Sequence, residues 1–112
     1  MAPTATYLQR GEALDYKNDT EATIPHGTII TIGTRIGVTG CEIAPGKVGS
    51  LHVCGVFRIK KTGSAAIKQG QTVYFDGTGI TDEANGDTNI EVGYAAEPAE
   101  AADETVLVKI NG

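Results

Sequence analysis

Short β-branched runs separated by glycine-containing turns are the feature that most limits the fold of this chain. Fifteen glycines and four prolines are spread over 112 residues. The runs 28–32 and 35–39, for example, stop at Gly33 and Gly40. Valine, isoleucine and threonine favour extended backbone, whereas glycine and proline favour turns. The pattern predicts about eight strands of roughly four to eight residues, with a turn about every ten residues.

The predicted fold is all-β: a single small β-sandwich or barrel, jelly-roll-like, with an extended N-terminal arm. A chain of 112 residues forms one domain with one core. We expect residues 1–23, which are mostly polar, to form the arm and an edge segment. Residues 24–112 are expected to form the β-domain. The run 105–110 is apolar on both faces, which predicts a central strand.

The stretch 48–59 alternates between apolar and polar residues more clearly than any other part of the chain. A period of two is typical of a half-buried strand, so we expect one continuous strand here. One face then carries His52 and Cys54, and the opposite face points into the core. The expected core residues of the whole domain are Leu51, Val53, Phe57, Ile59, Val73, Phe75, Val92, Val106 and Val108.

His52 and Cys54 raise the question of metal binding or catalysis. A metal site needs three or four converging ligands, and the further candidates Cys41 and His26 give neither Cys-x-x-Cys nor His-x-x-x-His spacing. A nucleophilic cysteine needs a base within hydrogen-bond reach, but side chains two residues apart on a strand point in parallel. We therefore expect no catalytic residue, no metal site and no cofactor. The two cysteines are expected to be free, buried thiols.

Three segments repeat one pattern: an apolar residue, glycine three positions later, and then a strand. They begin at Ile24, Ile43 and Ile67. Their spacing is unequal, which indicates reuse of the same turn chemistry and argues against a solenoid. The second segment contains Pro45-Gly46, a pair suited to the centre of a type II turn. Residues 65–69 are expected to form one helical turn.

The formal net charge of −5 argues against a nucleic-acid partner, because phosphate contacts need clustered cations. The one basic cluster, Arg58, Lys60 and Lys61, lies at the end of a predicted strand, where charge discourages edge pairing. No stretch approaches the roughly 20 apolar residues of a membrane span, and the N-terminus does not read as a secretory signal. We expect a soluble protein without a membrane partner.

Seven segments, none with a catalytic signature, show similarity to a known family: residues 7–16, 36–38, 43–46, 55–57, 67–76, 92–94 and 106–112. Through them the chain resembles small tailed-phage and prophage proteins associated with capsid cement, or decoration. It departs from their pattern at Cys54, where an acidic or small residue is usual, and at Phe75, where tryptophan is common.

The resemblance implies a non-enzymatic protein that binds the outside of the assembled capsid and stabilises it. A cement protein does so by burying surface across seams between capsid subunits. The implied partner is the major capsid protein. The implied state is a homo-oligomer, a trimer in preference to a dimer. The expected location is the exterior of the virion capsid, after a soluble stage in the bacterial host cytoplasm.

The arm carries apolar groups that a small core does not need, and exposed turns offer further contacts. The expected capsid or oligomer contacts are Tyr7, Leu8, Leu14, Tyr16, Pro25 and Pro45. The alternative is a small stand-alone β module that binds a ligand or carries a group. In that case His52 and Cys54, or Lys47 at a hairpin tip, would be functional. Lys47 lacks the Asp-Lys-Ala or Met-Lys-Met context of lipoyl and biotin carriers.

Overall fold

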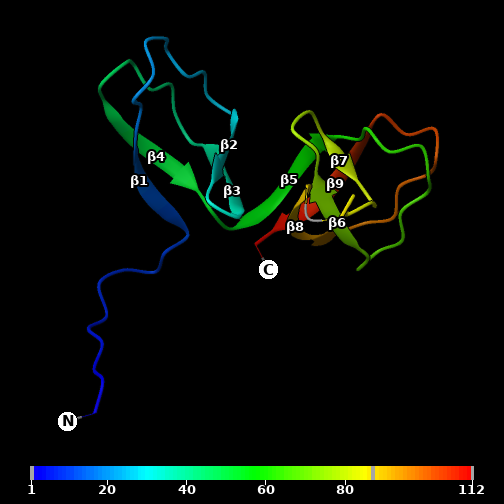
Figure 1. Cartoon of the computed structure of the whole chain (residues 1–112), viewed down its shortest axis with the longest axis horizontal. Coiled ribbons are helices and arrows are strands. Elements are labelled where there is room, and N and C mark those ends of the chain that lie inside the picture. The colour runs from blue at the N-terminus through cyan, green and yellow to red at the C-terminus, as the bar shows by residue number, and fades with distance from the viewer. Residues whose placement is uncertain (1, 87, 112) are drawn as a thin grey trace.

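Two antiparallel sheets make up the fold (Figure 1). The computed structural model describes residues 2–86 and 88–111, and these contain nine strands. The strands are β1 (Ala13–Lys17), β2 (Ile29–Ile32), β3 (Arg35–Thr39), β4 (Val48–His52), β5 (Gly55–Lys60), β6 (Thr72–Phe75), β7 (Ile80–Thr81), β8 (Ile90–Ala95) and β9 (Thr105–Ile110). The first sheet has the order β1-β4-β3-β2 and the second β5-β9-β8-β6-β7. The all-β prediction is confirmed, as is the central position of the strand at 105–110.

The stretch 48–59 does not form one strand, so that prediction was wrong. β4 ends at His52 in the first sheet, and β5 begins at Gly55 in the second. Val53 and Cys54 link the two sheets. Gly55 has a φ of 123°, a conformation that residues with a side chain rarely adopt. The chain therefore crosses from one sheet to the other here, while apolar alternation continues on both sides of the crossing.

The two sheets have the same connectivity, and their registers match except for a shift between Val73 and Tyr74 where β6 pairs with β8. The order β1-β4-β3-β2 in the first sheet matches the order β5-β9-β8-β6 in the second (Figure 1). β1 pairs Leu14 with Leu51, and β5 pairs Phe57 with Val108 in the same way. The chain is thus an internal repeat, in which β1, β2, β3 and β4 correspond to β5, β6, β8 and β9. β7 is an addition to the second half.

The turn pattern seen in the sequence marks equivalent places in the two halves. Ile24 and Ile43 exchange two backbone hydrogen bonds of 2.9 Å, and Ile67 and Ala99 exchange two of 2.8 Å. All four residues are buried. The segment after Ala99 was not recognised because it carries no glycine at the third position. The helical turn predicted for 65–69 was wrong, because the backbone of Ile67 pairs with Ala99 instead.

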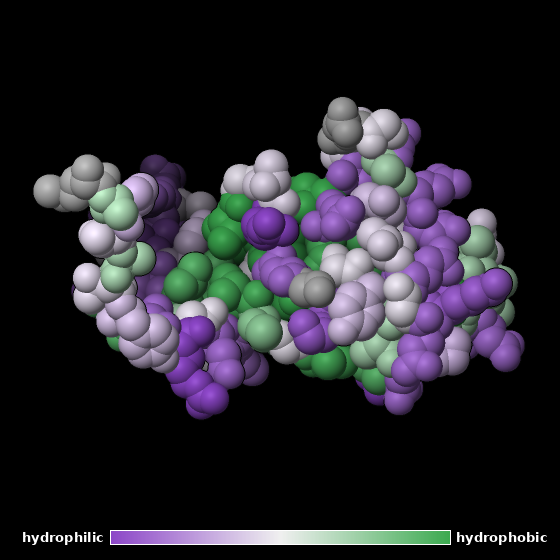
Figure 2. Space-filling model, turned by 90° about the horizontal axis from the view of Figure 1, so that it is seen from below, coloured by the Kyte–Doolittle hydropathy of each residue, from purple (hydrophilic) through white to green (hydrophobic). Residues whose placement is uncertain are grey.

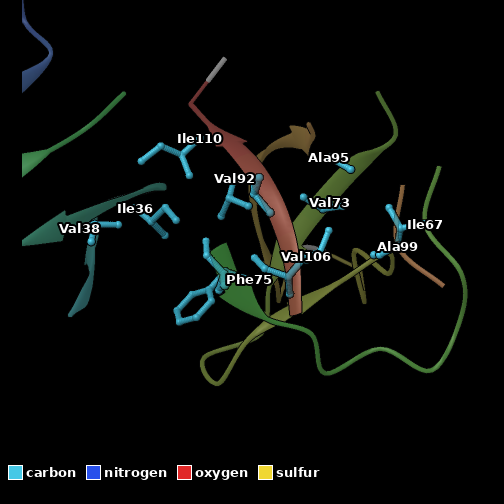
Figure 3. Packing of buried hydrophobic residues seen from close by; sticks show 13 residues of the cluster. Ile36, Val38, Ile67, Val73, Phe75, Val92, Ala95, Ala99, Val106 and Ile110 are labelled. Atoms are coloured by element: carbon cyan, nitrogen blue, oxygen red, sulfur yellow. The ribbon is translucent and has the colours of Figure 1, made fainter. Parts of the chain in front are cut away.

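The main hydrophobic cluster lies on one face of the second sheet and is completed by the first sheet (Figure 3). Ile36 and Val38, both from β3, are the two members from the first sheet. The others are Ile59, Ile67, Val73, Phe75, Ile80, Val92, Ala95, Ala99, Val106, Val108 and Ile110. Burying an aliphatic side chain of this size contributes about 1.5–3 kcal/mol. Ile36 and Val38 together therefore contribute roughly 3–6 kcal/mol to holding the sheets together.

The expected core residues divide between this cluster, a smaller group and the junction of the sheets. Leu51 is buried with Ile24 and Ile43 in the first sheet, outside the main cluster. Val53 and Phe57 were expected inside but are only half-buried. Val53 lies in the link between the sheets, and Phe57, on β5, packs at the margin of the main cluster. The remaining expected core residues are buried: Ile59, Val73, Phe75, Val92, Val106 and Val108.

Asn111, directly after β9, ties the end of the second half to the first sheet. Its side-chain amide donates hydrogen bonds of 2.8 Å to the carbonyl oxygens of Ile36 and Val53. Its backbone N–H donates to the carbonyl oxygen of Val92 at 2.6 Å. One residue therefore bonds to both β3 and β8, which are equivalent strands of the repeat.

Candidate interaction surface

The N-terminal arm, residues 2–12, contains no strand and extends away from both sheets (Figure 1). Tyr7 and Leu8 on this arm are 79% and 88% exposed. The arm is anchored at Glu12, whose carbonyl oxygen accepts a 3.0 Å hydrogen bond from the Val53 N–H. Covering this exposed tyrosine and leucine with a partner would lower the free energy, because their apolar surface would be removed from water.

Leu14 and Tyr16 lie on one face of the first sheet, because side chains alternate along β1. Leu14 is 40% exposed and Tyr16 is half-buried. Leu51 is paired with Leu14 on the same face, and a Cβ on Gly37 would come within 2.5 Å of the Leu51 side chain. Gly37 therefore belongs to this face, and so does Ile30, its partner on β2.

We call this surface the outer face of the first sheet. It consists of Leu14, Tyr16, Ile30, Ile32 and Leu51. Figure 2 shows that hydrophobic residues gather in the middle of the side seen from below, between the arm and the second sheet. On the outer face of the first sheet, Leu14 is the most exposed of these side chains, and it lies two residues after Glu12, where the arm is anchored.

Pro25 and Pro45 are exposed in two turns that lie side by side, because Ile24, directly before Pro25, and Ile43, two residues before Pro45, are bridged. The second turn has the predicted type II features: Gly46 has a φ of 74° and an Ala44–Lys47 hydrogen bond closes it at 3.0 Å. These turns lie at the end of β1 opposite to the arm. The structure thus brings the two prolines together and separates them from Tyr7 and Leu8.

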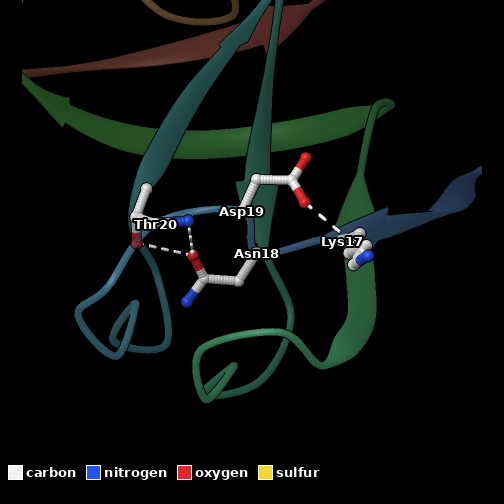
Figure 4. A network of polar contacts seen from close by, with 4 residues as sticks. All are labelled: Lys17, Asn18, Asp19 and Thr20. Carbon is white, nitrogen blue, oxygen red and sulfur yellow. Dashed lines mark hydrogen bonds and ion pairs between the residues drawn. The ribbon is translucent and has the colours of Figure 1, made fainter.

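Asn18 holds these turns together, and Figure 4 shows it beside Thr20, which donates to its side-chain oxygen. Its side chain is completely buried. Its amide nitrogen donates hydrogen bonds of 2.8 and 2.9 Å to the carbonyl oxygens of Ala22 and Ile43. Its side-chain oxygen accepts hydrogen bonds from the backbone N–H and hydroxyl of Thr20, at 2.9 and 2.6 Å. No motif marked this residue, because its partners are mostly backbone groups.

Lys61 occupies the position equivalent to Asn18 in the second half, directly after β5. It is buried, and its ammonium group donates to the carbonyl oxygens of Gly63 and Ala101 at 2.7 and 3.1 Å. Each half therefore uses one buried polar side chain after its first strand to fix its turns. This lysine was expected in an exposed basic cluster, so that prediction was wrong for Lys61.

His52 and Cys54 do not share a strand face, contrary to the prediction. His52 ends β4, and its ring lies 6.3 Å from that of Phe57, whereas Cys54 is exposed in the link between the sheets. Cys41 is exposed as well. Both thiols are free, but the expectation that they would be buried was wrong.

Asp76 is the one group in the described residues whose pKa clearly departs from its ordinary value. The Thr62 hydroxyl donates a 2.7 Å hydrogen bond to its carboxylate and is the main reason that the pKa of Asp76 is lowered. The backbone N–H groups of Gly79 and Thr78 also donate to it, each at 2.9 Å. The carboxylate therefore accepts hydrogen bonds that stabilise the turn between β6 and β7.

Residues 2–86 and 88–111 contain no group of three or more His, Cys, Asp or Glu side chains that could hold a metal ion. They also contain no helix long and apolar enough to cross a membrane.

Comparison with known proteins adds one finding to this geometry. A family model described as phage cement protein matches residues 8–110. No curated protein and no solved structure matches the chain. The family match covers both halves of the repeat, from the arm to the last strand. The chain therefore belongs to the phage cement protein family.

Proposed function

We propose that this protein binds the outside of an assembled phage capsid and stabilises the shell, without catalysing a reaction. Membership of the cement family supports a structural role at the capsid. The observation that carries the proposal is the arm, on which Tyr7 and Leu8 are almost fully exposed. Apolar surface buried against a partner contributes about 25 cal/mol per Å², and the partner on this proposal is the major capsid protein.

Stabilisation would follow from linkage between binding and assembly. A protein that binds the closed shell but not its separated subunits lowers the free energy of the shell. At a free concentration 100 times the Kd, each occupied site contributes about 2.7 kcal/mol. The protein would act as a homo-oligomer, with a trimer favoured, so that several arms bind together and weak contacts reinforce one another. It would stay in the host cytoplasm until shells form, and would then bind to the virion exterior.

The first sheet offers two separate contacts with a capsid. The arm leaves one end of β1, and the turns at Pro25 and Pro45 lie at the other end. The five residues of β1 separate the start of the arm from these turns by about 16 Å, and Tyr7 and Leu8 lie further out on the arm. We propose that the protein bridges neighbouring capsid subunits with these two contacts, while its rigid sheets keep the spacing constant.

The test is to remove the arm's apolar groups without altering the folded body. A Tyr7→Ala/Leu8→Ala double variant should bind purified capsids about 10- to 100-fold more weakly, since two large apolar contacts are lost. Its unfolding temperature should match that of the native protein, because both side chains lie outside the core. Co-sedimentation with capsids measures the first effect and circular dichroism the second.

A Val48→Ala variant is the matched control for the arm, because Val48 is exposed on β4 and pairs with Lys17 at the end of β1 opposite to the arm. It should bind capsids like the native protein. Unchanged binding by the double variant would exclude the arm as a capsid contact. If saturation with native protein left the disassembly temperature of the capsids unchanged, the stabilising role itself would be rejected.

A further inference from the structure

The internal repeat shows how one half of this protein covers the other. We call the covered surface the inner face of the second sheet; it consists of Phe57, Ile59, Val73, Phe75 and Val108. Ile36 and Val38 from the first sheet pack into the same cluster. Gly37, between them on β3, belongs to the opposite face with Leu51. The first sheet therefore covers the second with its own inner face and not with its outer face.

The outer face of the first sheet is the structural counterpart of the covered face of the second. The matching registers align Leu14, Tyr16, Ile30, Ile32 and Leu51 with Phe57, Ile59, Val73, Phe75 and Val108, in that order. All ten side chains are apolar or aromatic. Leu14 is 40% exposed, and Tyr16, Ile30 and Ile32 are half-buried. None of these four belongs to the main cluster.

The two halves thus pack front to back, meaning that two non-equivalent faces of the repeat are in contact. The outer face of the second sheet remains uncovered, and it is equivalent to the inner face of the first sheet, which covers the second sheet. It carries Val56, Tyr94, Leu107 and Lys109. Val56 is 55% exposed, and the Lys109 ammonium lies 5.8 Å from the centre of the Tyr94 ring. This face is therefore partly apolar and carries a cation already placed over an aromatic ring.

We propose that the outer face of the first sheet binds the outer face of the second sheet of another copy. The contact would continue between molecules the front-to-back packing that joins the halves within one molecule. Two different surfaces meet in such a contact, so it is heterologous and forms a closed ring when the rotation permits. In a ring of three copies, the six sheets would follow one another around the ring, each packed on the next in the same front-to-back manner. The proposal rests on the homo-oligomeric state proposed above, but not on capsid binding.

One charged substitution on each surface tests the contact. Leu14→Lys changes the first surface and Val56→Lys the second, and both side chains are exposed enough for the fold to tolerate lysine. Each should raise the dissociation constant of the oligomer by about 100-fold or more, because a charge would be buried without a partner. Light scattering after size-exclusion chromatography should show an oligomer for the native protein and monomers for both variants. Val48→Lys, on neither surface, should assemble like the native protein.

Mixing the two variants distinguishes a heterologous contact from a self-complementary one. Leu14→Lys keeps an intact second surface and Val56→Lys an intact first surface, so one native contact can form between them. Native mass spectrometry should therefore detect a heterodimer in the mixture. A self-complementary contact would give no heterodimer, and this result would overturn the proposal. It would also be overturned by a monomeric native protein, or by a Val56→Lys variant that assembles normally.

Capsid co-sedimentation separates failure of this inference from failure of the proposed function. If the native protein is a monomer yet binds and stabilises capsids, the ring is wrong and the cement function stands. If the predicted heterodimer forms but no version of the protein binds capsids, the contact is right and the cement function fails.

Discussion

Replacing Asn18 by aspartate provides the sharpest test of how the turns of the first half are held. The change keeps the shape of the side chain but converts its donor group into a second acceptor. In the native protein that donor bonds to the carbonyl oxygens of Ala22 and Ile43 at 2.8 and 2.9 Å. In the variant a carboxylate oxygen would face both carbonyl oxygens in a completely buried position.

The magnitude follows from the two lost hydrogen bonds and the buried charge. Each bond contributes about 1 kcal/mol, and leaving buried polar groups unsatisfied costs about 1–3 kcal/mol more. Asn18→Asp should therefore reduce the free energy of unfolding by about 3–5 kcal/mol at neutral pH. This is a large share of the roughly 5–15 kcal/mol typical of a small domain. Urea denaturation followed by circular dichroism measures the loss, with Asn85→Asp in an exposed turn as the control.

The loss should also depend on pH in a defined direction. Burial and the neighbouring carbonyl oxygens raise the pKa of the introduced carboxyl above its value in the unfolded chain. The folded variant then binds a proton more tightly than the unfolded chain, so its deficit is complete above the folded pKa and shrinks as the pH falls through it. A deficit below about 1 kcal/mol, or one that does not change with pH, would refute the role assigned to Asn18.

Three further changes test other parts of the molecule. Ile36→Ala removes a contact between the sheets and should cost about 2–5 kcal/mol in urea denaturation; a cost under about 1 kcal/mol would show that this contact does not join them. Gly93→Ala should prevent folding, because its φ is 142° and the new Cβ would overlap the carbonyl oxygen of Lys109. Gly77→Ala, also at positive φ but in open space, should cost far less, and equal losses would exclude the overlap as the cause. Asp76→Asn should be less stable than the native protein above about pH 4, because a folded-state pKa lowered below the unfolded value of 3.8 stabilises the native protein there. The difference should shrink as the pH falls from 3.8 through the folded-state pKa, and a difference that stays constant below pH 3.8 would contradict this.

Local chemistry made several elements predictable. The β-branched runs that became β2 and β3 end at glycines, and Pro45-Gly46 forms the turn that its residue types favour. The break in the stretch 48–59 was not predictable in the same way. The apolar alternation is preserved across it, because each flank contributes to a buried group of its own sheet. Only Gly55 marks the crossing, and one glycine among fifteen carries little information.

The candidate interaction surface was predictable only in part. Tyr7 and Leu8 were recognisable as apolar residues in a polar segment. The outer face of the first sheet depends on which strands pair and in what register, and neither follows from one sequence. The repeat could not be recognised from the sequence either, because equivalent positions hold different residues, as Ala99 and Ile43 do. Backbone geometry is retained between the halves even where side chains differ.

The short link between β4 and β5 has a consequence for folding during synthesis. In the described residues, the strand pairs of the first sheet lie within positions 13–52 and those of the second within 55–110. The first sheet can therefore pair its strands before the second half is complete. At 5–20 residues per second, the second half takes roughly 3–12 s to synthesise. During that interval Ile36 and Val38 are uncovered as well as the opposite face, so the nascent sheet exposes apolar residues on both sides. Ile36 and Val38 are covered only when the second half folds against them, so mutations that slow its folding should increase aggregation more than their effect on final stability implies.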